Sequence, residues 1–173
     1  MNKNVFFYLV IVCVITHIIR TIYEILKHKK KIIASKLSFV IVFINMLILW
    51  GSWFALCSFD IYKINIPDIF CYVGIVLFLF GIITFLWGLV TIKTLESYEG
   101  DLITTGIYAK IRHPMYLGFI LWSIGFPIFW EALFSFILSF LFIGNILYWR
   151  YLEEKELVER FPAYNTYKRT TLF

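Results

Sequence analysis

The protein has 173 residues, of which 61% are hydrophobic, 21% aromatic and 16% charged. A soluble domain is on average about 45–50% apolar and about 25% charged. The composition therefore excludes a soluble globular enzyme, a disordered chain and a basic nucleic-acid-binding protein. The formal net charge of +5 has to be explained by membrane topology before nucleic acid is considered as a partner.

Three apolar runs predict three membrane-spanning helices in the first half of the chain. The hydrocarbon core of a bilayer is about 30 Å thick, so a spanning helix needs roughly 20 apolar residues. The runs extend over residues 5–19, 37–59 and 69–92. A basic stretch follows the first run, and no small-x-small cleavage pattern does, which favours a retained helix over a signal peptide.

Small and polar residues inside these runs predict helix packing. Gly74, Gly81 and Gly88 are seven residues apart and share one face of the third helix, where they allow another helix backbone to come close. Asn45 and Asn145 are neutral polar groups at membrane depth. We expect them to bond neighbouring helices rather than a substrate.

A longer apolar stretch, residues 115–149, predicts a helical hairpin. Pro127 and Glu131 lie near its middle, and Glu131 is its only charge. We expect two short spans over residues 116–129 and 132–149, because one helix of 35 residues would be about 52 Å long. The predicted fold class is all-α: an integral membrane bundle of five transmembrane helices, with the fourth and fifth as a short hairpin.

The basic residues predict the orientation of this bundle. Fourteen of the 16 lysines and arginines lie in residues 20–36, in residues 93–112 or from residue 150 onwards. Five spans put these three segments on one side, so we expect the N-terminus outside and the C-terminus in the cytosol. A bacterial inner membrane is the expected location, with the endoplasmic reticulum as the alternative. Anionic lipid, rather than nucleic acid, is the expected partner of the positive charge.

Polar residues then gather in residues 101–116, just before the fourth span. Pro114 suits the first turn of a helix, whose free N–H groups can hold an anion. His113 directly precedes it, and Gly106 permits a tight turn upstream. A juxtamembrane loop in which Arg112 faces lipid phosphates explains the same residues equally well.

A second charged segment follows the fifth span. Arg150 and Glu154 are four residues apart and can pair on one helix face. Glu153 and Glu154 lie so close to the membrane core that they need a partner, for which Arg150, Arg112 or a cationic ligand would serve. The alternative is a solvated charged helix that ends before Pro162.

Together the two segments resemble a known enzyme family. Residues 102–108 read Leu-Ile-Thr-Thr-Gly-Ile-Tyr, residues 112–116 read Arg-His-Pro-Met-Tyr, and Glu153-Glu154 is followed by Phe161, Tyr164 and Tyr167. This order resembles the signature of isoprenylcysteine carboxyl methyltransferase and its prokaryotic relatives, which are related to phospholipid N-methyltransferases. The resemblance covers residues 93–173. It divides the chain into an N-terminal three-helix region, 1–92, and a cofactor-binding catalytic region, 93–173.

The resemblance implies an S-adenosylmethionine-dependent methyltransferase whose pocket faces the cytosol. It implies catalytic roles for Arg150, at the acceptor side, and Glu154, and leaves open whether Glu153 or Glu154 reaches the cofactor. The implied cofactor contacts are Asp101, Leu102, Ile103, Tyr108, His113, Pro114, Met115, Tyr116, Glu153 and Glu154.

The resemblance also implies a lipidic or membrane-embedded acceptor. The carboxylate of a prenylated cysteine is the leading candidate, and a phospholipid amine or a small hydrophobic molecule is the alternative. Two other classes are an NADPH-dependent membrane reductase and a non-catalytic membrane protein. No metal is expected, because Cys13, Cys57 and Cys71 lie far apart and form no Cys/His cluster.

Overall fold

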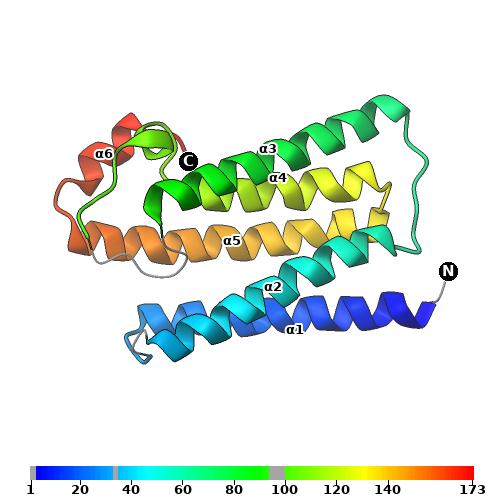
Figure 1. The fold of residues 1–173 in the computed structure, drawn as a ribbon, viewed down its shortest axis with the longest axis horizontal. Helices are drawn as coiled ribbons and strands as arrows, with labels where there is room; N and C mark the ends of the chain where they lie inside the picture. The colour runs from blue at the N-terminus through cyan, green and yellow to red at the C-terminus, as the bar shows by residue number, and fades with distance from the viewer. Residues whose placement is uncertain (1–2, 33–34, 94–99) are drawn as a thin grey trace.

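A computed structural model describes residues 3–32, 35–93 and 100–173. Four helices in these ranges are long and apolar enough to span a membrane, and a fifth apolar helix is shorter. The chain is therefore a helical membrane bundle, as predicted (Figure 1). The elements in chain order are α1 (Lys3–His28), α2 (Lys36–Ser58), α3 (Asp68–Ile92), the 3-10 helix η1 (Gly106–Ala109), α4 (Pro114–Phe129), α5 (Leu133–Arg160) and α6 (Tyr164–Thr170).

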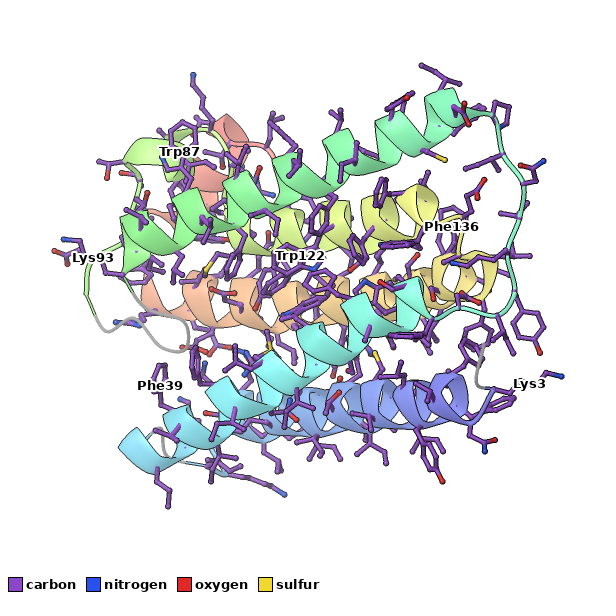
Figure 2. All side chains as sticks on the ribbon, turned by 45° about the vertical axis from the view of Figure 1, so that its right-hand side comes forward. Lys3, Phe39, Trp87, Lys93, Trp122 and Phe136 are labelled. Atoms are coloured by element: carbon purple, nitrogen blue, oxygen red, sulfur yellow. The ribbon has the colours of Figure 1, made fainter. Side chains whose placement is uncertain are left out.

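Helix α5 lies in the middle of the bundle, between the α1–α2 pair and the α3–α4 pair (Figure 1). The C-terminal ends of α1, α3 and α5 and the whole of α6 lie at one end of the bundle, opposite the N-terminal end of α1. Figure 2 shows Lys93 and Lys3 at these opposite ends, with Trp122 inside. The described residues of the three basic segments predicted to share one side of the membrane thus lie at the same end.

The predicted hairpin is confirmed, and its turn is held by a buried carboxylate. Pro127 lies in the last turn of α4, and Glu131 adopts a positive φ of 54° between the two helices. Asp60, from the loop before α3, accepts hydrogen bonds from the backbone N–H and the hydroxyl of Ser135 at 2.7 and 2.8 Å. The carboxylate therefore satisfies one of the free N–H groups at the start of α5.

Helix α5 differs from the prediction in its length. The apolar run stops at Trp149, but the helix continues without a break to Arg160. Its 28 residues make it about 42 Å long, so its charged end extends beyond a bilayer core. Glutamate, lysine and arginine are good helix formers, so the charges mark where the helix leaves the apolar region and not where it ends.

The closest helix contact in the bundle joins α3 to α4. A Cβ placed at Gly81 would lie 2.8 Å from the carbonyl oxygen of Gly118, and one at Gly125 would lie 2.5 Å from that of Gly74. The glycine face predicted on the third helix is therefore a packing face, and glycines of α4 pack against it. Asn45 likewise bonds a neighbouring helix, since its side-chain amide donates to the carbonyl oxygen of Thr16 at 3.1 Å.

Replacing Gly125 with alanine is expected to destabilise the protein by about 1–3 kcal/mol, because the added methyl group meets backbone atoms of α3. Gly144→Ala is the matched control, since a Cβ there meets nothing within 4 Å. Reversible unfolding in mixed detergent and SDS measures the difference. Equal stability of the two variants would contradict the close packing of α3 on α4.

Candidate active site

The start of α4 is fixed by its contact with α3. Pro114 is the first residue of α4, and a Cβ at Gly88 would lie 2.9 Å from its Cγ. Gly106 has a φ of +60° and fits against the side chain of Thr91, so the tight turn predicted there is confirmed. This packing buries His113, which is only 5% exposed, at the point where α4 begins.

Helix α6 packs against the same segment with two tyrosines. The hydroxyl of Tyr164 lies 3.4 Å from Nε2 of His113, and the hydroxyl of Tyr167 donates to the carbonyl oxygen of Tyr108 at 2.6 Å. Burial, together with the negative charge of Glu154, raises the pKa of Tyr164. Its hydroxyl therefore stays protonated at neutral pH and can act as a donor or an acceptor to the imidazole.

Arg112 joins the segment before α4 to the end of α6 and the residues that follow it. Its Nη1 donates to the carbonyl oxygens of Thr171 and Lys168 at 2.6 and 2.9 Å. Its backbone N–H donates to the carbonyl oxygen of Leu172 at 3.0 Å, and the N–H of Leu172 donates to that of Lys110 at 2.8 Å. We call this set of bonds the tail clasp. It holds two segments that are far apart in the sequence in one orientation.

The two adjacent glutamates of α5 face different surroundings. Glu154 contacts three basic side chains: Nζ of Lys168 at 2.5 Å, Nε of Arg112 at 3.4 Å and Nε2 of His113 at 3.4 Å. The Glu153 carboxylate lies 3.8 Å from Nδ1 of His113 and borders a cavity. Glu154 therefore belongs to the framework around His113, and Glu153 is open to a ligand.

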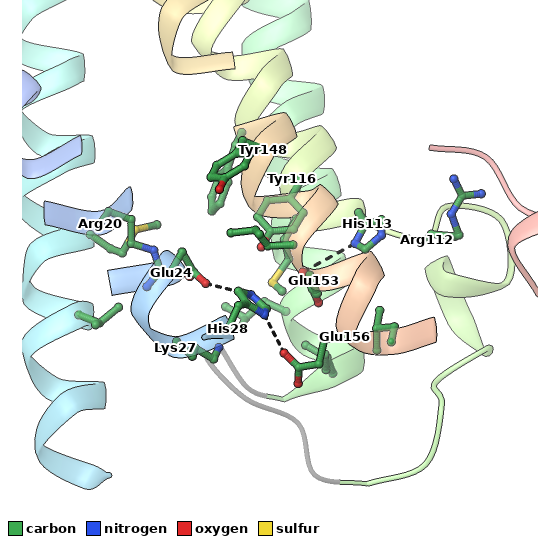
Figure 3. A pocket seen from close by; sticks show the side chains of 18 of the residues that line it. Arg20, Glu24, Lys27, His28, Arg112, His113, Tyr116, Tyr148, Glu153 and Glu156 are labelled. Carbon is green, nitrogen blue, oxygen red and sulfur yellow. Dashed lines mark ion pairs between the residues drawn. The ribbon is translucent and has the colours of Figure 1, made fainter. Parts of the chain in front are cut away.

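This cavity has a volume of about 1130 Å³ and passes from the polar end of the bundle into its apolar interior (Figure 3). Tyr116 and Glu153 border its polar part. Its apolar part is bordered by Trp50 of α2, Phe85 of α3 and Trp122 of α4, among others. One cavity therefore offers both a polar and an apolar wall.

Most of the residues implied by the resemblance line this cavity. They are Asp101, Leu102, Ile103, Tyr108, His113, Met115, Tyr116 and Glu153. Pro114, Glu154 and Arg150 are not among its lining residues. The guanidinium of Arg150 lies 4.5 Å from the centre of the Phe173 ring, so Arg150 is turned toward the end of the tail rather than paired with Glu154.

The first helix contributes polar residues that we did not predict for the site. Arg20, Glu24 and His28 line the cavity and lie four residues apart on one face of α1 (Figure 3). Arg20 pairs with Glu24, Nε2 of His28 lies 3.5 Å from Glu24 and its Nδ1 lies 2.8 Å from Glu156 of α5. The signal was present in the sequence, since ionisable residues within an apolar helix usually mark a functional site.

The cysteines take no part in this site. Cys13 and Cys57 are buried thiols, and Cys71 is a free thiol on α3. In the part of the chain that the structure describes, no group of three or more His, Cys, Asp or Glu side chains is placed to hold a metal ion.

Comparison with known proteins adds one finding. The family model described as phospholipid methyltransferase matches residues 69–164. The match begins in α3, includes α4 and α5 with both glutamates, and reaches the first residue of α6. Helices α1 and α2 lie outside it. No curated protein and no solved structure matches the chain.

Replacing Arg112 with glutamine is expected to loosen the tail clasp. A hydrogen bond to a charged group contributes about 1.5–3 kcal/mol, so the amide hydrogens of α6 should exchange roughly tenfold faster or more. Hydrogen exchange of the detergent-solubilised protein measures this effect. The control is Arg169→Gln, which changes an exposed arginine of α6 itself. Equal exchange rates of the α6 amides in both variants would contradict the role of Arg112.

Proposed function

The chain belongs to the phospholipid methyltransferase family, and from this premise we propose that it transfers a methyl group from S-adenosylmethionine to a lipidic acceptor. The observation that carries the proposal is the two-sided cavity. Polar side chains from the segment 101–116 and from α5 line this cavity together with apolar side chains of α2, α3 and α4. A polar cofactor and an apolar acceptor that react together need such a cavity.

The residues at the polar end fit the proposed cofactor. When bound, S-adenosylmethionine supplies a methyl group on a positively charged sulfur. Tyr108 and Tyr116 line the cavity, and aromatic ring faces attract such a cation. The carboxylate of Glu153 suits the amino group of the cofactor, and the free N–H groups that follow His113 at the start of α4 suit its carboxylate.

We assign the cofactor contact to Glu153 and a positioning role to Glu154. Glu153 borders the cavity, whereas Glu154 contacts Lys168, Arg112 and His113. Glu154 would therefore act through His113, by fixing the imidazole where it faces the ligand. Asp101, Leu102, Ile103 and Met115 also line the cavity and remain in the proposed cofactor set.

The apolar chain of the acceptor would lie between α2 and α3. Phe43 and Met46 of α2 and Phe85 and Leu86 of α3 border the cavity, and α2 packs mainly on α1 rather than on α3. A lipidic molecule can then enter from the bilayer between these two helices. In this water-poor space, the residues promote an in-line transfer chiefly by aligning the reactants and by excluding water.

The carboxylate of a prenylated cysteine is our leading acceptor, and a phospholipid amine or a small hydrophobic molecule is the alternative. An ionised carboxylate reacts without a base and needs only a neutralising cation. An amine must first lose a proton, and a glutamate of the cavity would take it.

S-adenosylhomocysteine, the demethylated product, is expected to bind the purified protein in isothermal titration calorimetry. Replacing Glu153 with glutamine should weaken this binding roughly tenfold or more, because a charge-assisted hydrogen bond is lost. Arg169→Gln, outside the cavity, should bind like the unchanged protein. Absence of binding would refute the cofactor assignment, and binding of NADPH instead would favour a reductase.

We further propose that the basic end of the bundle faces the cytosol of a bacterium, with the protein in the inner membrane. The proposal is supported by the three basic segments at that end. A fluorescent protein fused to the C-terminus should therefore be fluorescent in cells, and alkaline phosphatase fused there should be inactive. The opposite result with both reporters would reverse the topology.

A further inference from the structure

We propose that Arg20 of α1 binds the acidic group of the acceptor, a carboxylate or a phosphate attached to an apolar chain. This inference deepens the proposed function and rests on it. It assigns recognition of the acidic group of this acceptor to a helix outside the segment matched by the family model.

The position of Arg20 suits a headgroup that enters from the membrane. Arg20 lies eight residues before His28, the last residue of α1. It is therefore about 12 Å deeper in the bundle than the end of the helix. It is only 8% exposed and yet borders the cavity, as do Tyr116 and Glu153 (Figure 3). An acidic group held there would lie beside the proposed cofactor region.

The guanidinium of Arg20 has donors that the described residues leave unused. Its Nη2 pairs with Glu24, but Nε and Nη1 are buried without a hydrogen-bond partner in the described part of the chain. Glu24 is shared with His28, so it does not serve Arg20 alone. Unsatisfied donors of a buried charge are unfavourable, and the fork of a guanidinium matches the oxygens of a carboxylate or a phosphate.

The surroundings of Arg20 favour an acid that carries an apolar chain. The ring of Trp149 lies 5.9 Å from Cζ of Arg20. The same Trp149 belongs to an apolar cluster with Phe119 and Trp122, against which Trp50 packs. The positive charge therefore lies at the edge of the apolar wall of the cavity, so a ligand can pair its acidic group with Arg20 and pack its chain against these rings.

Four other cations are less well placed for this role. Arg150, which the resemblance implied at the acceptor side, is not among the lining residues and lies over the ring of Phe173. Arg112 is engaged by the tail clasp. Lys29 and Lys30 border the cavity but are exposed, and hydrated lysines at a rim select poorly between ligands.

Binding of brominated probes to the whole protein in phosphatidylcholine nanodiscs tests the proposal. The probes are hexadecanoate, hexadecyl phosphate and hexadecanol, each brominated on the chain, and their binding quenches the fluorescence of Trp50 and Trp122, which border the cavity. We expect the acids to bind roughly tenfold tighter or more than the alcohol. The tighter of the two acids identifies the headgroup.

Three variants connect this preference to Arg20. The paired replacement Arg20→Gln with Glu24→Gln removes both charges and should abolish the preference for acids. Glu24→Gln alone should strengthen acid binding, because it releases Arg20 from its partner; a purely structural ion pair would not give this gain. Arg169→Gln is the matched control and should bind all probes unchanged.

Several outcomes would overturn the proposal. They are equal binding of acids and alcohol, an acid preference that survives the paired replacement, or a preference lost only in Arg150→Gln. If the paired variant does not fold, as judged by thermal unfolding, the Glu24→Gln variant decides the test. Stronger acid binding in this variant supports the proposal, and unchanged or weaker acid binding overturns it. Calorimetry with S-adenosylhomocysteine on the same samples separates the two claims, since it tests the cofactor assignment without any acid.

Discussion

The rest of the structure depends on the close contact between α3 and α4. Glycines on both helices remove the side chains that would otherwise separate the backbones, so the two helices pack with little freedom to slide. The contact continues to the polar end, where Pro114 lies against Gly88. Close helix packing inside the membrane therefore determines where α4 begins along the bundle axis. It thereby positions His113, the residue before α4, opposite the glutamates of α5.

Much of this arrangement could be predicted from the sequence, because its causes are local. Apolar runs of the right length give the spans, Pro127 and Glu131 give the turn between α4 and α5, and the spacing of the glycines gives the packing face of α3. The gathering of the residues proposed to bind the cofactor also follows from order along the chain, since two polar segments that flank a hairpin must return to the same end of the bundle.

Other features depend on contacts that no single segment reveals. The sequence shows Arg20 as an ionisable residue at the end of an apolar run, but only the packing of α1 against α5 shows that it borders the cavity. Arg150 and Glu154 have the spacing of an ion pair, but Glu154 meets Lys168 of α6 and Arg112 of the loop instead. Tertiary partners compete with helical neighbours, and a partly buried carboxylate is stabilised by the larger number of donors.

The tail clasp has a consequence for how the protein is made. Its bonds and the tyrosine contacts beside it join residues 51 to 62 positions apart, so residues 108–113 have no such partners while α5 and α6 are still being synthesised. Insertion of the early helices into the membrane can be complete before this segment is fixed. Residues 108–113 can therefore reach their final contacts only after α6 has been made, when the helices of the apolar bundle have already been synthesised.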